Sequence, residues 1–173
     1  MITKKVVLVG DFATGKTSLI RRYVDNQFSD DYLTTIGVKI SKKIVLFHAA
    51  QLEMEVQLMI WDIEGHTDGK PTNPAYIMGA HGLLIVADVT RDSSLDNIGA
   101  HIEACRKVAK GAPIFLALNK SDLIKDSNEL AVLIQGLKNR HEQIELVYAT
   151  SAKEGTNVEN VFIELSQFMI TKR

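Results

Sequence analysis

Four short apolar runs set the strongest limit on how this chain can fold: Val6–Val9, Leu83–Val86, Ile114–Leu118 and Leu146–Tyr148. Segments with the hydrophobic periodicity of helices separate them. This alternation is typical of a parallel sheet wrapped by helices, because buried parallel strands are apolar on both faces. The pattern therefore predicts an α/β doubly wound fold.

Two stretches between the first two runs alternate strictly between apolar and polar residues. Period two predicts strands with one buried face. The apolar positions are Val38, Ile40, Ile44 and Leu46 in the first stretch, and Leu52, Met54, Val56, Leu58 and Ile60 in the second. Because only the short His48–Gln51 connection joins the stretches, we expect an antiparallel pair at one edge of the sheet. The expected sheet is six-stranded and mostly parallel, with one antiparallel edge strand and helices on both faces.

Two apolar stripes at helical spacing predict helices that pack on this sheet. They consist of Leu95, Ile98, Ile102 and Cys105, and of Val158, Val161, Phe162, Leu165 and Phe168. The chain has 173 residues, of which 46% are hydrophobic, and this suits one core better than two. Residues 1–173 are therefore predicted to form a single domain.

Composition excludes several classes of protein. The formal net charge is −1 and the basic residues are dispersed, so we expect no nucleic-acid partner. The single cysteine, Cys105, excludes an intramolecular disulfide and a multi-cysteine zinc site, and fits a reducing compartment such as the cytoplasm. No apolar run approaches the roughly 18 residues that a membrane-spanning helix needs.

Lipid anchors are also unexpected in the sequence as written. Residue 2 is Ile rather than Gly, and the segment Ile170–Arg173 contains no cysteine for a prenyl group. Whether a longer, cysteine-containing tail is missing stays open.

A glycine-rich segment carries the strongest functional signal. Residues Gly10–Thr17 fit the pattern G-x-x-x-x-G-K-[ST], directly after the run Val6–Val9 and before a helix expected to begin near Lys16. Such a loop directs backbone N–H groups at a phosphate, and the helix dipole favours the anion. The residues expected to contact the nucleotide are Phe12, Ala13, Thr14, Gly15, Lys16, Thr17 and Ser18. Lys16 would bridge the β- and γ-phosphates, and the Thr17 hydroxyl would bind Mg²⁺.

A second polar motif, Asn119-Lys120-Ser121-Asp122, follows the run Ile114–Leu118 and predicts the base. Guanine presents two donors on one edge, and a carboxylate at Asp122 can accept both. Adenine would place a lone pair against that carboxylate. The loop Thr150–Lys153 follows the next run, where the Ala152 N–H can reach guanine O6 and Ser151 can hold Asp122. Lys153 completes the expected base-binding set.

With these loops in place, the sequence resembles the Ras superfamily of small GTPases over essentially its whole length, and the Rab branch looks most similar. The supporting segments are Thr34–Val38, Trp61-Asp62, Gly79–Gly82 and Asp88–Thr90. The resemblance implies a P-loop NTPase fold that binds GTP or GDP with Mg²⁺.

The resemblance also assigns further residues. It implies that Phe28 packs on the guanine and that Thr35 binds Mg²⁺ from the first switch. Asp62 would hold the ion through water, and the Gly65 N–H would contact the γ-phosphate. Hydrolysis would then release both switch loops. The second switch, 67–76, should not form an uninterrupted helix, because it contains Gly69, Pro71 and Pro74.

Partners follow from the same resemblance. We expect effector, exchange-factor and activating proteins to bind the switch loops of a monomer. We expect a cytoplasmic protein, peripheral to membranes through its partners, in a role such as vesicle trafficking.

The sequence departs from the family at Asp62-Ile63-Glu64-Gly65-His66, where members usually carry Asp-Thr-Ala-Gly-Gln. His66 replaces the glutamine that orients the attacking water, so it is either the catalytic partner of Lys16 or a loop histidine without catalytic work. Glu64 would place a carboxylate beside the phosphates unless it faces solvent, pairs with a basic side chain or approaches Mg²⁺, and of these we expect exposure to solvent. Phe12 replaces a small residue and could obstruct an arginine supplied by an activating protein.

These departures leave two hypotheses open: a GTPase that cycles slowly, and a module that stays GTP-bound because hydrolysis is deficient. An adenine-nucleotide kinase or ATPase is disfavoured by Asp122.

The remaining histidines and basic pairs do not indicate a functional site. His48, His81, His101 and His141 are scattered without the spacing of metal ligands. The pairs Arg21-Arg22 and Lys42-Lys43 are expected to lie on solvated faces.

Overall fold

The computed structural model describes residues 2–31, 34–49, 52–67 and 70–171. The strands are β1 Ile2–Val9, β2 Val38–Ala49, β3 Leu52–Ile63, β4 Gly82–Asp88, β5 Ile114–Asn119 and β6 Ile144–Ala149. The helices are α1 Lys16–Asp25, α2 Pro74–Ile77, α3 Asp92–Asp96, α4 Ile98–Val108, α5 Ser127–Arg140 and α6 Val158–Thr171, with a 3₁₀ turn, η1, at Ser121–Leu123.

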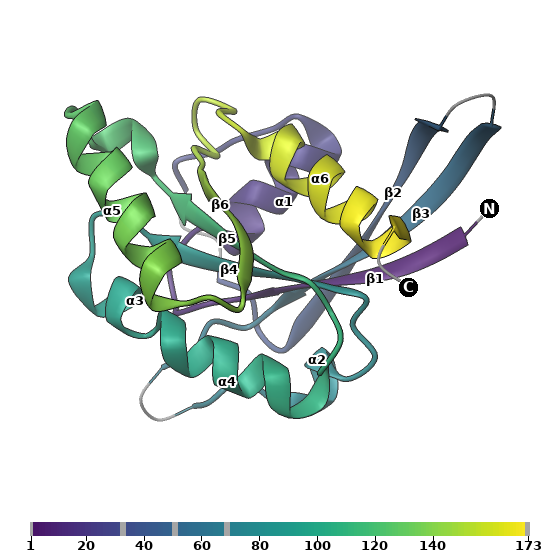
Figure 1. Ribbon diagram of the computed structural model, residues 1–173, viewed down its shortest axis with the longest axis horizontal. Helices are drawn as coiled ribbons and strands as arrows, with labels where there is room; N and C mark the ends of the chain where they lie inside the picture. The colour runs from purple at the N-terminus through teal and green to yellow at the C-terminus, as the bar shows by residue number, and fades with distance from the viewer. Residues whose placement is uncertain (1, 32–33, 50–51, 68–69, 172–173) are drawn as a thin grey trace.

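The six strands form one sheet in the order β2-β3-β1-β4-β5-β6 (Figure 1). Every neighbouring pair is parallel except β2 with β3, which is antiparallel. The predicted six-stranded, mostly parallel sheet with an antiparallel edge strand is therefore confirmed.

Helices cover both faces of the sheet. In Figure 1, α1 and α6 lie above it, whereas α2, α3 and α4 lie below. Leu19, Tyr23 and Phe162 pack with one face of the strands, and Ile98 and Leu137 with the other. The Tyr23 and Phe162 rings stack with centroids 4.1 Å apart. These two apolar layers hold the strands, and therefore the loops that follow them, in fixed positions.

The predicted apolar runs behave differently at the centre and at the edge of the sheet. The central strands β4 and β5 are buried along their whole length, whereas β6 is mostly half-buried because it lies at an edge. Cys105 is fully buried, as its place in the apolar stripe predicts. That stripe spans two helices, α3 and α4, which divide at Asn97.

Lys43 was expected on a solvated face, and this expectation is wrong. Its ammonium group lies 4.0 Å from the centroid of the Tyr23 ring and donates to the Tyr23 carbonyl oxygen. The contact joins the edge strand β2 to α1.

No helix within the described part of the chain is long and apolar enough to cross a membrane.

Candidate nucleotide-binding site

The carboxyl ends of the parallel strands meet at one edge of the sheet and build a pocket there. The pairing of Leu8 with Asp62, and of Asp88 with Asn119, aligns these ends. The loop after each strand therefore opens on the same side, where open α/β sheets bind ligands.

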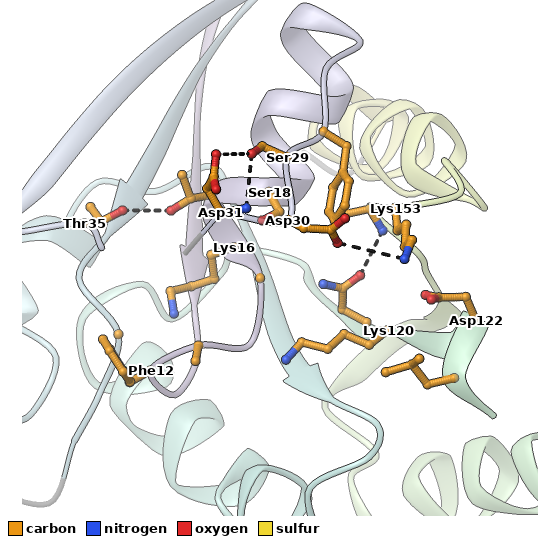
Figure 2. A pocket seen from close by; sticks show the side chains of 18 of the residues that line it. Phe12, Lys16, Ser18, Ser29, Asp30, Asp31, Thr35, Lys120, Asp122 and Lys153 are labelled. Atoms are coloured by element: carbon orange, nitrogen blue, oxygen red, sulfur yellow. Dashed lines mark hydrogen bonds and ion pairs between the residues drawn. The ribbon is translucent and has the colours of Figure 1, made fainter. Parts of the chain in front are cut away.

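The pocket has a volume of about 390 Å³. Figure 2 shows Phe12 and Lys16 at one end and Asp122 at the other. The predicted residues that line it are Phe12, Ala13, Gly15, Lys16, Thr17, Ser18, Phe28, Thr35, Gly65, Asn119, Lys120, Asp122, Ala152 and Lys153. Thr14, Asp62, His66 and Ser151 do not line it, although each is next in the chain to a residue that does.

Backbone geometry shapes the glycine-rich loop around Lys16. Gly15 has a φ of 93°, and a Cβ there would lie 2.3 Å from Asn119 Nδ2, so a side chain has no room. Helix α1 begins at the next residue. Its free N–H groups therefore point into the pocket, as a phosphate site requires.

Lys16 is buried, with 6% of its surface exposed. Its Nζ donates to the carbonyl oxygens of Gly10 at 3.1 Å and Asp11 at 2.7 Å. Burial lowers its pKa to about 8, although Asp62 and Asp11 act in the opposite direction. An anion in the pocket would stabilise the ammonium form, because an opposite charge favours the charged state.

Asn119 joins three loops of the pocket. Its Nδ2 donates to the Thr14 carbonyl oxygen at 3.0 Å, and its Oδ1 accepts from the Ala152 N–H at 3.2 Å and from Thr150 Oγ1 at 3.4 Å. Only 2% of Asn119 is exposed. One amide therefore fixes the distance between the phosphate end and the base end.

We expect Asn119→Ala to weaken GDP binding by about ten- to a hundredfold and to lower the free energy of unfolding by about 2–4 kcal/mol, because buried partners lose their hydrogen bonds. Titration of GDP and chemical unfolding measure the two effects. Asn128→Ala, on the exposed start of α5, is the matched control. A loss of stability with unchanged GDP affinity would show that Asn119 does not set the loop spacing.

The base end contains the expected contact between Ser151 and Asp122. Ser151 Oγ donates to Asp122 Oδ1 at 2.6 Å, and the Ser151 hydroxyl also accepts from the Glu154 N–H at 3.0 Å. Nearby, Lys120 Nζ lies 2.5 Å from Asp88 Oδ2. The carboxylate of Asp122 is thus held in one orientation before any base arrives.

Arg22 was expected on a solvated face, and this expectation is wrong. Its guanidinium donates to the carbonyl oxygens of Ala152 at 2.8 Å and Lys153 at 2.6 Å. Arg22 therefore ties helix α1 to the loop after β6. Its partners are backbone atoms, which sequence patterns do not reveal.

Three oxygen-bearing side chains meet beside Lys16, as a Mg²⁺ site requires. Thr17 Oγ1 lies 2.7 Å from Thr35 Oγ1 and 2.6 Å from Asp62 Oδ2, and Thr35 donates to the same carboxylate oxygen at 3.1 Å. Asp62 Oδ1 is buried without a hydrogen-bond partner among the described residues. Burial raises the pKa of Asp62, against the effect of both threonines. Hard oxygen donors around an unpaired buried carboxylate oxygen fit a magnesium ion.

Glu64 pairs with a basic side chain, which was one of its three expected arrangements, instead of facing solvent alone. Lys70 Nζ lies 2.8 and 2.7 Å from its two carboxylate oxygens, and the Gly37 N–H donates to Oε2 at 3.0 Å. These contacts, Lys70 first, lower the pKa of Glu64. Glu64 therefore joins the two switch segments to each other.

The segment just before the second switch lies directly on the glycine-rich loop. The Phe12 N–H donates to the His66 carbonyl oxygen, and the His66 N–H donates to the Gly10 carbonyl oxygen, both at 3.0 Å. A Cβ on Gly65 would lie 2.5 Å from Phe12 Cα, so this approach requires glycine. The His66 imidazole turns away from the pocket, and its Nδ1 lies 3.6 Å from Asp11 Oδ1.

The second switch itself does not form an uninterrupted helix in its described part, as its prolines predict. Residues 70–73 are not helical, and the short α2 begins at Pro74. Gly69 lies outside the described residues.

Sequence reasoning missed five residues that also line the pocket: Ser29, Asp30, Asp31, Ile63 and Leu123. Proximity to Phe28 and Asp122 in the chain was the available signal for most of them.

Comparison with known proteins agrees with this geometry. The sequence profile of the Ras family matches residues 5–171. The GTP-binding protein ypt1 of Schizosaccharomyces pombe is 33% identical over 168 residues, which cover 94% of this chain and 78% of that protein. The Ras-related protein RABD2a of Arabidopsis thaliana is 33% identical over 164 residues, with 94% and 77% covered. The Ras-related protein Rab11A of Lotus japonicus is 37% identical over 161 residues, with 91% and 68% covered.

The family match and the identities extend over the loops that build the pocket. This chain therefore belongs to the Ras family and is a Rab-like small GTPase.

Proposed function

We propose that this protein is a regulatory switch that binds GTP and GDP with Mg²⁺, hydrolyses GTP slowly, and signals through the order of its two switch loops. The observation that carries the proposal is the cluster of Thr17, Thr35 and Asp62. It brings the phosphate loop, the first switch and the end of β3 to one point next to Lys16.

Nucleotide recognition in this proposal divides between the two ends of the pocket. The amides of the loop from Phe12 to Ser18 and the Lys16 ammonium bind the phosphates. Asp122 selects guanine, with Phe28 and Lys153 at the rim of the base pocket. The Ala152 N–H donates to Asn119 Oδ1 at 3.2 Å and would have to share its hydrogen with guanine O6.

The proposed Mg²⁺ ligands are Thr17 and Thr35 directly, and Asp62 through water. When bound, the ion would neutralise charge on the phosphate oxygens. Thr35 would be drawn to the ion and Gly65 to the γ-phosphate only in the GTP state. Loss of that phosphate would release both segments, which is the physical basis of the switch.

Slow hydrolysis is supported by the placement of His66. Its ring does not line the pocket, and both of its backbone hydrogen-bonding groups are engaged by the phosphate loop. To orient water, the imidazole would have to leave Asp11. Phe12 lines the pocket with 41% of its surface exposed, where its ring would obstruct an arginine supplied in trans.

His66 and Phe12 also favour a second candidate: a module that binds GTP and hardly hydrolyses it. The nucleotide that copurifies with the protein separates the candidates. Mostly GDP supports the cycling GTPase, and mostly GTP after slow purification supports the module.

We expect single-turnover release of phosphate at or below about 10⁻⁴ s⁻¹ without a partner, the scale of unassisted small GTPases. In His66→Ala this rate should fall further if the imidazole orients water; an unchanged rate removes His66 from the mechanism. His141→Ala, far along the chain in the turn after α5, is the control. A rate near 1 s⁻¹ in the unaltered protein contradicts slow hydrolysis.

Effector, exchange-factor and activating proteins are the proposed partners of the switch loops, with the protein acting as a monomer. Peripheral attachment to membranes through these partners, in vesicle trafficking, is the cellular setting that we propose. Pull-down with protein loaded with a non-hydrolysable GTP analogue or with GDP tests whether binding depends on the nucleotide.

A further inference from the structure

Two histidines and one aspartate converge beside the phosphate loop without taking part in nucleotide recognition. Asp11 lies in the loop, His66 directly before the second switch and His101 on α4. Asp11 Oδ1 lies 2.8 Å from His101 Nε2 and 3.6 Å from His66 Nδ1. One donor atom from each residue can be chosen so that all three lie within 4.8 Å of one another.

These separations suit a small transition-metal ion. Zinc takes nitrogen and oxygen ligands at about 2.0–2.2 Å in tetrahedral geometry, which places neighbouring donor atoms about 3.3–3.6 Å apart. The two donor separations at Asp11 are 2.8 and 3.6 Å, and all three donor atoms lie within 4.8 Å of one another. Side-chain shifts on the order of 1 Å would therefore bring the donors to these separations.

The surroundings orient the donors as metal ligands commonly are. Asn97 Nδ2 donates to Asp11 Oδ2 at 2.9 Å, which leaves Oδ1 facing the two imidazoles. Only 8% of Asp11 and 4% of His101 are exposed, so bulk water competes weakly for them. Burial lowers the pKa of His101, against the effect of Asp11, and a neutral imidazole is the form that binds metals.

The two imidazole rings are oriented so that each directs a different nitrogen at Asp11. The His66 and His101 rings meet edge to face, with centroids 5.5 Å apart and planes at 85°. His66 presents Nδ1 to the cluster and His101 presents Nε2. Each residue can thus supply one nitrogen without the two rings occupying the same space.

We propose that Asp11, His66 and His101 form a second metal site, for a divalent first-row transition metal such as Zn²⁺. Two imidazoles and one carboxylate suit zinc, whereas magnesium prefers an all-oxygen set such as Thr17, Thr35 and Asp62. The fourth position would be taken by water. Occupancy would hold the second switch on the phosphate loop and on α4.

Nearby charge decides which form of the protein should be tested. Lys16 donates to the Asp11 carbonyl oxygen at 2.7 Å, and its positive charge opposes a metal ion. Nucleotide phosphates would offset that charge. The test therefore uses the full chain without a histidine tag, loaded with GDP and kept in excess Mg²⁺ so that oxygen sites are filled.

Zn²⁺ is titrated in competition with a chromogenic chelator, and Co²⁺ is used as a spectroscopic probe. We expect one Zn²⁺ per chain with a Kd below about 10⁻⁶ M, and visible absorption of tetrahedral Co²⁺. His66→Gln and His101→Gln should each weaken binding at least a hundredfold and remove the Co²⁺ band. Asn97→Ala should weaken it about ten- to a hundredfold, as loss of a residue that orients a ligand does.

His141→Gln is the control and should bind Zn²⁺ like the unaltered protein, since His141 lies outside the cluster. His66 is more exposed than His101, with 28% of its side chain accessible, so His66→Gln tests the site even if His101→Gln fails to fold. Absence of a stoichiometric site in the unaltered protein overturns the proposal. So does Zn²⁺ affinity that persists in His66→Gln. Because GDP binding is measured separately, this failure would leave the proposed switch function untouched.

Discussion

Asp122→Ala is expected to abolish the preference for GTP over ATP and to weaken guanine-nucleotide binding by about 10²- to 10⁴-fold. Two hydrogen bonds from guanine to a carboxylate contribute about 1.5–3 kcal/mol each, and the variant makes neither. Ser151 Oγ, 2.6 Å from Asp122 Oδ1, holds that carboxylate in place. ATP binding should not weaken, because the carboxylate offers adenine no donor and faces its lone pair.

Competition between labelled GDP and unlabelled GTP or ATP measures this preference. Glu129→Ala, on the first turn of α5, removes one acidic group outside the pocket and is the control. If Asp122→Ala retained the full preference for GTP, the assignment of the base end would be wrong, and with it the guanine specificity of the pocket.

Lys16→Met is expected to weaken GDP and GTP binding by about 10³-fold while leaving the affinity for guanosine unchanged. The methionine keeps the buried aliphatic stem but removes the ammonium group that would bind two phosphates. In the nucleoside those phosphates are absent. The variant therefore separates the phosphate end from the base end, whereas Asp122→Ala should weaken GDP and guanosine alike, because both contain guanine.

Calorimetric titration with GDP and guanosine gives both affinities for each variant. Lys125→Met changes an exposed lysine beyond the base end and should bind both ligands normally. Equal losses for GDP and guanosine in Lys16→Met would point to collapse of the pocket instead of a lost phosphate contact, and thermal unfolding of the same samples would reveal it.

The phosphate loop and the guanine loop could be predicted because each is a local motif at the end of a strand. Gly15 and Lys16 lie six and seven positions after Val9, the last residue of β1, and Asn119 is the last residue of β5. Apolar runs fix where parallel strands end, and parallel strands end at one edge. Sequence order alone therefore brings these residues together.

The contacts of Glu64 and Arg22 could not be predicted in the same way. Glu64 meets Gly37 and Lys70, and Arg22 meets carbonyl oxygens some 130 residues away. A charged side chain near a ligand can pair, coordinate or face solvent. Which of these it does depends on the backbone groups that the other loops leave without a hydrogen-bond partner.

The sequence by itself determined the sheet, the pocket edge and the places of Lys16 and Asp122 at that edge, because periodicity and short motifs act within a few residues. Only the tertiary structure decided that His66 turns to Asp11 and meets His101. These residues lie 55 and 35 positions apart, on three separate segments. Helix α4 brings His101 to the loop through packing of its apolar face, and that packing leaves no signal in the spacing of histidines.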